Sequence, residues 1–552
     1  PPPWRKPRLK KQAGISWCQN KYRVMLMADD QKSKLYKLKP ITDRLPAVSK
    51  PEGHVHFRTK MLWVIVILVF YFIMTNVFLY GLDSGKTVDL FAQYRAILAG
   101  AQGSLMHLGI GPIVTASIIM QLFVGAKIIK LDLTNKDDKA VYQSSQKFLV
   151  LVMILVEAVP QVFGYLMPSD VFIAGMEGTF GDSGFFRGEN IARLVIVVQL
   201  CVGSYLVFLM DEVVSKWGIG SGISLFIAAG VAEALFTGTL NTEGLDRSLP
   251  LSNSNLPVGT IPKTIYILTH QSASDLVGGG YEKILIANPN PLIALIGTII
   301  IFLFVAYVES ARIELPLAHG TARGARGRYP IKLIYASNIP VILMAALLAN
   351  ISMFTMLFYT NDVLSGIPLL GGNPLLGAYP AGENYPTSGL AWYLSTPNGV
   401  GDWLLPLLNP GAYGSMVHGH SSWQVIVHVL IYVGVMVGGS VLFAKFWIMT
   451  TNMGPEAVAR QIESSGLQIP GFRRDPRVLK RVLERYIPIV TVISGAVVGG
   501  LAAGADLIGT VGNASGTGVL LAVGIMIQFY EALGREQMME MHPVLRGFFG
   551  GE

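Results

Sequence analysis

Charge is scarce in this sequence of 552 residues. Charged residues make up only 14% of the chain, whereas they make up about 25% of a typical soluble domain. Hydrophobic residues account for 51% of the chain, and its mean hydropathy is +0.49. This composition excludes a soluble globular protein and indicates an integral membrane protein.

Cysteine and the common catalytic motifs are also lacking. The chain has two cysteines, Cys18 and Cys201, which are too few for a disulfide framework or a cysteine-based metal site. It contains no phosphate-binding loop, no zinc signature and no convincing nucleophile–base set. We therefore expect a protein that is not an enzyme and that needs no metal or other cofactor.

Charged residues are nearly absent from the long apolar segments. An ion-coupled transporter usually places charged or strongly polar side chains at mid-membrane. Glu157 is the one firm case within these segments. Two interpretations of Glu157 stay open: it is a functional carboxyl, or it hydrogen-bonds a neighbouring helix for structural reasons.

Ten apolar segments have the length of roughly 20 residues that a helix needs to cross a bilayer. Lysine and arginine crowd the N-terminal segment and the loops after the second, sixth and eighth of these segments. The positive-inside rule then places both termini in the cytoplasm. The expected spans are about 61–81, 97–126, 147–167, 191–210, 219–238, 289–309, 333–358, 423–449, 487–505 and 515–533.

The spans divide into two halves of five, which gives the halves opposite orientations in the membrane. The predicted fold is therefore an all-α, polytopic membrane protein built from an inverted repeat. Residues 1–24 are interpreted as a tail or as upstream sequence that was wrongly translated, with Met25 or Met27 as a possible natural start. The expected parts are a cytoplasmic N-terminal segment (1–60), a first half (61–238), an extracytoplasmic loop (239–288), a second half (289–533) with cytoplasmic loops at 310–332 and 450–486, and a cytoplasmic tail (534–552).

The second apolar segment is interrupted. Gly109, Gly111 and Pro112 all disfavour a continuous helix through this point. Broken backbone at membrane depth is tolerated only where protein buries it or where it lines a water-filled cavity. We expect a short re-entrant helix, a break at Gly111–Pro112, and a half-helix that runs to Phe123. A single helix kinked at the proline is the alternative.

Similar interruptions recur in the second half of the chain. Pro340 precedes a branched pair, as Pro112 does, and the Gly220–Gly222 stretch resembles Gly516–Gly518. Interrupted segments at corresponding places in two halves point to a pathway at the repeat interface. The residues at these breaks are aliphatic and mostly branched, which favours a hydrophobic constriction that seals against ions. They are Ile110, Val114, Ile223, Ile227, Ile342 and Leu521.

Three other interpretations compete with a pore. The six aliphatic residues are ordinary core positions in the first. In the second, the chain is a secondary transporter of small solutes, which would need a charged or carbonyl-lined site at mid-membrane. In the third, it is a lipid insertase or scaffold, which would lack a water-filled path.

Five stretches carry a resemblance to a known family. Together with the order of the breaks, they resemble SecY, the channel subunit of the general protein translocase, and are most similar to its archaeal form. The resemblance runs from about residue 40 to the C-terminus, whereas residues 1–24 have no counterpart and the loops 239–285 and 360–421 match poorly. The stretches are Leu108–Gln121, Asp211–Ile223, Arg328–Ile342, Pro470–Arg474 and Ser515–Leu521.

The resemblance implies a channel that moves unfolded polypeptides across the cytoplasmic membrane and releases transmembrane segments through a lateral gate. The six aliphatic residues would form its pore ring, and the short helix around Ile97–Leu108 would be its plug. The gate would lie between the second and third spans on one side and the seventh and eighth on the other. Its polar cluster would consist of Thr115, Glu157 and Asn338.

The resemblance also implies partners. The ribosome would dock on the two basic loops through Arg326, Arg328, Arg473 and Arg474, although a solvated cytoplasmic loop explains their charge equally well without the resemblance. Two small single-span subunits, SecE and a beta or SecG-type subunit, would complete a heterotrimer. Signal peptides, nascent chains and membrane lipid would be the remaining partners.

Overall fold

The structure is a computed structural model that describes most of the chain between residues 34 and 541. Arg473, Arg474 and the expected tail 1–24 lie outside the described residues. The described residues are 34–37, 40, 44, 46, 48–53, 55–83, 95–126, 128–129, 131, 135–164, 166–181, 187–246, 249–319, 326–332, 334–335, 338–360, 366–367, 370–380, 385–417, 419–451, 453–464, 467–468 and 476–541.

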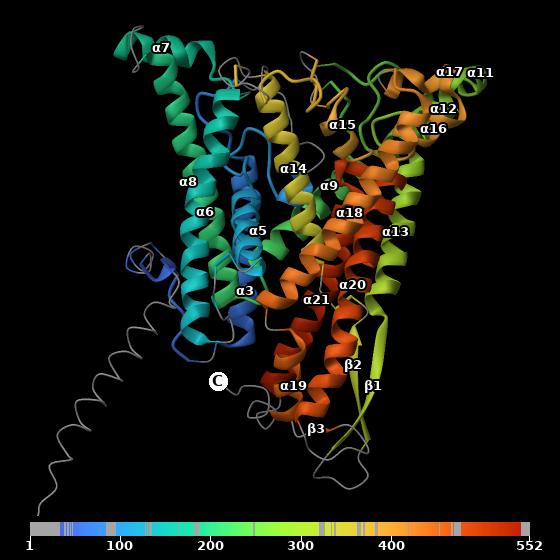
Figure 1. Cartoon of the computed structure of the whole chain (residues 1–552). Coiled ribbons are helices and arrows are strands. Elements are labelled where there is room, and N and C mark those ends of the chain that lie inside the picture. The colour runs from blue at the N-terminus through green and yellow to red at the C-terminus, as the bar shows by residue number, and fades with distance from the viewer. Residues whose placement is uncertain are drawn as a thin grey trace, which may run out of the picture.

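Within these residues, nine helices are long and apolar enough to cross a membrane, and one further apolar helix, α5, is shorter. These helices run side by side along one direction (Figure 1). Each overlaps one of the ten expected spans, although α6 and α20 begin well before the expected positions and α5 covers only the second half of the span 97–126. The helices are α3 (Phe57–Asn76), α5 (Gly111–Gly125), α6 (Lys136–Gly164), α8 (Gly188–Trp217), α9 (Gly222–Leu240), α13 (Leu292–Ser310), α14 (Ile339–Thr360), α18 (Ser422–Thr450), α20 (Pro476–Ile508) and α21 (Gly516–Met541).

The two halves run in opposite directions. Near the start of α3, Lys60 pairs with Glu536 of α21 at 2.8 Å, so α3 begins at the end of the molecule where α21 finishes. Helix α13 instead finishes at that end, where Arg312 pairs with Glu531 of α21 at 3.1 Å. The first helices of the two halves therefore point in opposite directions, as an inverted repeat requires.

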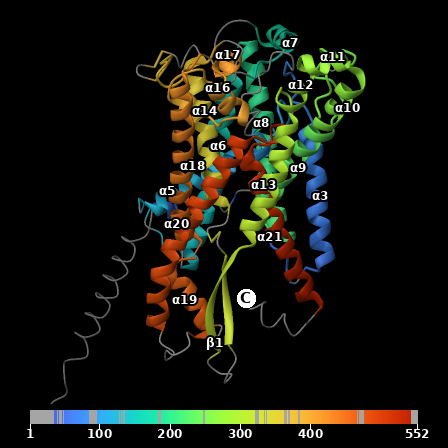
Figure 2. The same cartoon turned by 90° about the vertical axis from the view of Figure 1, so that its right-hand side faces the viewer.

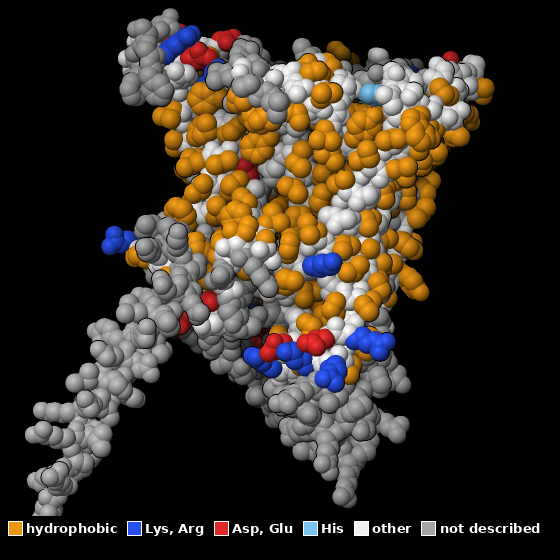
Figure 3. All heavy atoms as spheres, viewed as in Figure 1, with side chains coloured by type: hydrophobic (Ala, Val, Ile, Leu, Met, Phe, Trp, Pro, Cys, Tyr) orange, Lys and Arg blue, Asp and Glu red, His pale blue; other side chains and the backbone are white. Residues whose placement is uncertain are grey.

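Apolar side chains cover the middle of the molecule. Figure 3 shows hydrophobic side chains over the central part of one face, with most of the lysine, arginine, aspartate and glutamate side chains at its two ends. On α13, Leu303 is 63% exposed and Tyr307 is 77% exposed. A band of exposed apolar side chains is what the lipid-facing surface of a membrane protein requires.

A small sheet departs from the all-α expectation. Strand β1 (Arg312–His319) pairs antiparallel with β2 (Arg326–Lys332), and the two-residue strand β3 (Leu467–Gln468) joins β1. The sequence did not predict these strands because Pro316 and Pro330 argue against a strand interior. Figures 1 and 2 both show the hairpin projecting beyond the membrane helices at the end that holds α19 (Pro455–Ser464).

The loops at the opposite end contain short helices where the sequence predicted only polar loops. Helix α7 (Asp170–Phe180) also lies at this end (Figure 1). The first long loop holds α10 (Thr260–His270), α11 (Ala273–Asp275), η2 (Leu276–Gly280) and α12 (Tyr281–Leu285). The second holds α15 (Leu390–Leu394), η3 (Val400–Asp402), α16 (Leu404–Leu408), α17 (Pro410–Tyr413) and η4 (Gly414–Val417). Two further 3-10 helices are η1 (Lys34–Lys37) and η5 (Val511–Asn513).

The two prolines at the predicted breaks begin helices. Pro112 is the second residue of α5, and Pro340 is the second residue of α14. Proline is favoured in the first helical turn because its missing N–H has no partner there in any case. The expected half-helix is thereby confirmed, and it ends at Gly125 close to the expected Phe123. The alternative of one kinked helix is excluded.

The segment before α5 differs from the expectation. Only α4 (Arg95–Leu98) is helical, and the backbone from Ala99 to Ile110 is a series of turns. The predicted short helix around Ile97–Leu108 is therefore wrong beyond Leu98. Gly109 has a φ of +55°, and a Cβ added there would lie 2.1 Å from the carbonyl oxygen of Leu98. This close approach requires glycine and holds the segment against α4.

Candidate functional site

The six aliphatic residues come from four helices and join one hydrophobic cluster. Ile110 caps the start of α5 and Val114 follows one turn later, while Ile223 and Ile227 are one turn apart on α9. Residues four apart share a helix face. Ile342 of α14 and Leu521 of α21 add the second half of the molecule. Five of the six are buried and Ile223 is half-buried against the same cluster.

A cavity of about 430 Å³ borders this cluster. Val114, Ile223 and Ile342 line it together with the polar side chains of Ser117, Gln143, Gln146, Ser221, Ser224 and Thr450. Trp447 and Thr451 at the end of α18 also line it, so the cavity lies on the side of the cluster that faces the β-hairpin end. Three of the six aliphatic residues thus line a hollow that also carries many polar side chains.

Residues 99–110, called here the turn segment, cover the side of the cluster opposite the cavity. Within it Met106 is fully buried, and the N–H of Ile110 donates to the carbonyl oxygen of Leu98 at 2.8 Å. Tyr71 of α3 donates its hydroxyl to the carbonyl oxygen of Ala99 at 3.3 Å. Helix α4 packs on α9 of the first half and on α14 and α21 of the second. The segment therefore rests on both halves at once.

The seam between the halves runs along α5 and α6 on one side and α14 and α18 on the other. Helix α5 packs against both α14 and α18, and α6 reaches α14. Gly125 of α5 sits against Phe446 of α18, because a Cβ added to this glycine would lie 2.4 Å from the phenylalanine ring. The helices expected to form a lateral gate are thus in direct contact.

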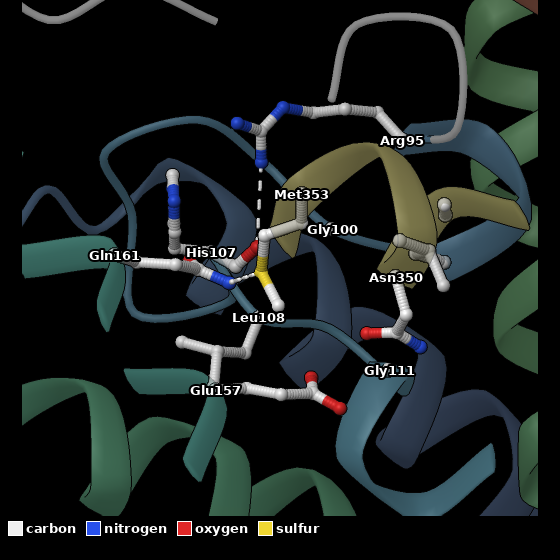
Figure 4. A pocket seen from close by; sticks show the side chains of 11 residues that line it. Arg95, Gly100, His107, Leu108, Gly111, Glu157, Gln161, Asn350 and Met353 are labelled. Atoms are coloured by element: carbon white, nitrogen blue, oxygen red, sulfur yellow. Dashed lines mark hydrogen bonds between the residues drawn. The ribbon is translucent and has the colours of Figure 1, made fainter. Parts of the chain in front are cut away.

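A polar contact crosses this seam. Asn350 of α14 donates its Nδ2 to the hydroxyl of Thr115 at 3.0 Å, and this hydroxyl donates to the carbonyl oxygen of Gly111 at 2.9 Å. Glu157 is only 4% exposed and lies beside Thr115 and Gly111. Figure 4 shows the Glu157 and Asn350 side chains around Gly111. Thr115 and Glu157 are therefore brought together as expected.

Asn338 does not take part in this contact. It lies immediately before α14, where its carbonyl oxygen accepts from the N–H groups of Val341 and Ile342 at 3.2 and 3.3 Å. Its side chain faces α21, since a Cβ added to Gly524 would lie 1.7 Å from its Nδ2. The structure places Asn350 where the sequence predicted Asn338. The signal for Asn350 was visible, because an asparagine within a transmembrane segment is rare and usually faces the protein interior.

A small cavity of about 20 Å³ extends the polar contact toward the turn segment. Figure 4 shows Arg95 and His107 above it and Gln161 and Met353 at its wall. Arg95 donates to the carbonyl oxygen of His107 at 3.3 Å, and Gln161 of α6 donates to the sulfur of Met353 at 3.6 Å. The turn segment and the seam therefore meet in one polar patch.

The basic hairpin is rooted on the last helix. Arg326 and Arg328 lie on strand β2. At the base of the hairpin, Lys332 pairs with Glu531 of α21 at 2.7 Å. This ion pair ties the base of the hairpin to α21.

Comparison with known proteins decides the family. The SecY family model matches residues 104–530, and the model for the plug domain of Sec61p matches residues 69–103. The chain belongs to the SecY family. The matched plug region overlaps the expected plug 97–108 from 97 to 103.

Individual relatives and solved structures also support membership of the SecY family. The protein translocase subunit SecY of Archaeoglobus fulgidus is 45% identical over 93% of this chain and 98% of that protein. SecY of Halobacterium salinarum is 44% identical over the same shares. A solved structure of a protein-conducting channel, 37% identical, covers 92% of this chain and 98% of that chain with a TM-score of 0.71. Sec61 in the canine ribosome-channel complex from the endoplasmic reticulum, also 37% identical, covers the same shares with a TM-score of 0.69.

SecY membership confirms the resemblance and the fold predicted from the sequence. The chain is a translocase subunit that forms a protein-conducting channel through a membrane. The arrangement described above supplies a cavity, an aliphatic cluster, a covering segment and a seam, which are the parts that such a channel needs.

Proposed function

We propose that the six aliphatic residues form the seal of the channel, in a cytoplasmic membrane with both termini in the cytoplasm. The carrying observation is their convergence from both inverted halves in one hydrophobic cluster, three of whose members line the adjoining cavity. Branched aliphatic side chains offer no group that coordinates an ion, so an empty throat lined by them dewets. They also deform around a passing chain of any sequence. In this proposal the protein is not an enzyme but a channel through which polypeptides pass.

The seam between α5–α6 and α14–α18 is the proposed lateral gate. The Thr115–Asn350 hydrogen bond and the neighbouring Glu157 hold it closed. Polar contacts between transmembrane helices contribute on the order of 1 kcal/mol each. A signal peptide would replace them with apolar packing, after which a transmembrane segment could leave sideways into lipid.

The partners follow from family and charge. Two relatives of known structure were solved as ribosome complexes, canine Sec61 and yeast Ssh1. Phosphate contacts with ribosomal RNA would suit Arg326 and Arg328 on the projecting hairpin, together with Arg473 and Arg474. SecE and a beta or SecG-type subunit would complete the complex.

A polar substitution in the ring tests the seal. The double variant Ile223→Asn plus Ile342→Asn places amides at two cavity-facing positions from the two halves. We expect a protein that folds and conducts ions at rest, because amide groups stabilise a water file in the throat. The measurement is single-channel current across planar bilayers, with parent and variant matched for the amount of purified protein.

Two controls give this test its meaning. Ile223→Leu plus Ile342→Leu keeps the throat apolar and should stay silent. A folded asparagine variant that is equally silent would remove these residues from the pore and leave them as ordinary core. Saturable uptake of a small solute by the parent would instead support a secondary transporter.

A further inference from the structure

In the first half, a half-buried carboxylate holds the start of a helix that carries the seal. Asp211 lies near the end of α8, and its Oδ1 accepts from the N–H of Ile223 at 3.0 Å. Ile223 is the second residue of α9 and one of the six aliphatic residues. The first N–H groups of a helix have no partner within it, so an acceptor from outside fixes where the helix begins.

The second half repeats this arrangement. Asp506 lies near the end of α20 and is 3% exposed, and its Oδ1 accepts from the N–H of Thr517 at 2.9 Å. Its Oδ2 accepts from the hydroxyl of Thr517 at 2.6 Å and from the hydroxyl of Tyr432 at 2.6 Å. Thr517 is the second residue of α21, which carries Leu521 one turn later.

The glycines of the repeated motif make both contacts possible. A Cβ added to Gly222 would lie 2.6 Å from the Cα of Asp211, and one added to Gly516 would lie 2.4 Å from the backbone nitrogen of Asp506. The acidic residue and the next helix start can approach only because no side chain stands between them. The two contacts occur at opposite ends of the molecule, because the halves are inverted.

Each contact stays within one half. Asp211, α8 and α9 belong to the first half, whereas Asp506, Tyr432 and α21 belong to the second. The halves can therefore move apart along the seam without breaking either contact. A carboxylate beside helical N–H groups is also favoured by the helix dipole.

We propose that Asp211 and Asp506 are positioning residues of the seal, which hold the starts of α9 and α21 so that the aliphatic ring re-forms after each opening. This inference rests on the proposed role of the ring. Without these acceptors, the first turns of both helices lose their fixed register against α8 and α20. Ile223 and Leu521 then no longer meet Ile342 in one closed throat.

The test compares three single variants of the purified full chain in planar bilayers. Asp211→Ala and Asp506→Ala remove the acceptors, and we expect the resting open probability to rise by about tenfold, which corresponds to about 1.4 kcal/mol. Asp211→Asn keeps an Oδ1 acceptor and should restore the silent state. This rescue would show that the acceptor oxygen of Asp211, and not its negative charge, keeps the channel closed.

A further variant controls for lost stability. Leu483→Ala empties part of a separate hydrophobic cluster at the other end of α20, where Leu483 is 1% exposed. It should lower the melting temperature without raising the resting current. Should Asp506→Ala fail to fold, Thr517→Val removes only the Thr517 hydroxyl that donates to Asp506 and keeps the backbone N–H that donates to it. A smaller rise in the resting current is then expected.

The outcomes separate the two proposals. Leak from the asparagine ring variant, together with silence from folded aspartate variants or from Thr517→Val, overturns the positioning role and leaves the ring in place. Equal leak from Leu483→Ala also overturns it, since any destabilised channel would then conduct. Silence from the ring variant overturns the ring, and the positioning role falls with it.

Discussion

The contact between Thr115 and Asn350 leads to a quantitative prediction for gate opening. Asn350→Ala removes a hydrogen bond of 3.0 Å across the seam. This change does not leave the Thr115 hydroxyl without a hydrogen-bond partner, because it still donates to the carbonyl oxygen of Gly111 at 2.9 Å. The closed gate therefore loses about the value of one interhelical hydrogen bond, on the order of 1 kcal/mol. The ratio of open to closed channels should then rise by about fivefold.

The assay is export of a reporter with graded signal peptides. A leucine at the centre of a membrane-inserted helix contributes up to about 0.6 kcal/mol, so the variant should export signals with about two fewer leucines than the parent requires. Asn338→Ala is the matched control, because the side chain of Asn338 faces Gly524 of α21 and has no hydrogen-bond partner among the described residues.

A double-mutant cycle completes the argument. Thr115→Val should lower the signal threshold in the parent and have little further effect in the Asn350→Ala background, because the two substitutions remove the same bond. Identical thresholds in Asn350→Ala and parent, or an equal shift from Asn338→Ala, would show that this contact does not control the gate.

Two further predictions concern the arginines at 473 and 474 and the buried Lys263. Arg473→Glu plus Arg474→Glu should reduce ribosome cosedimentation, and parent binding should weaken steeply with salt, because phosphate contacts release counterions; unchanged cosedimentation over a salt series would contradict ribosome docking at these residues. Burial lowers the pKa of Lys263 to about 8, and its Nζ donates to the carbonyl oxygens of Ala287 and Pro289 at 2.7 and 2.9 Å. Since the unfolded chain holds that proton up to its ordinary pKa, the melting temperature of the parent should rise between about pH 8 and pH 10.4 relative to Lys263→Gln, and parallel profiles would refute this.

The membrane helices could be predicted because each is a long apolar run. Lysine and arginine placement also predicted the inverted halves, and the two prolines marked true helix starts. The β-hairpin could not be predicted, since Pro316 and Pro330 hide its strands. Asp506 was missed because it stands one residue beyond the expected end of its span, where burial depends on packing against Tyr432 and Thr517.

Most residues of the ring and the seam could be predicted from the sequence, but their contacts could be predicted less well. The spacing of Ile110 and Val114, and of Ile223 and Ile227, placed each pair on one helix face. Sequence could not show which asparagine of the seventh span reaches Thr115, because that depends on how far along α14 the helix α5 crosses. Asn338 was expected because the SecY resemblance implied it, whereas Asn350 lies on the turn of α14 that meets α5.

The central claim is that a translocating polypeptide passes through the aliphatic ring. An export intermediate with one cysteine in its mature part is arrested in channels carrying Ile227→Cys, Leu521→Cys or the lipid-facing Leu303→Cys, each with Cys18→Ser and Cys201→Ala. The account predicts disulfide crosslinks to positions 227 and 521, one from each half, and none to position 303. Crosslinks confined to position 303, with both ring positions unreactive, would contradict it.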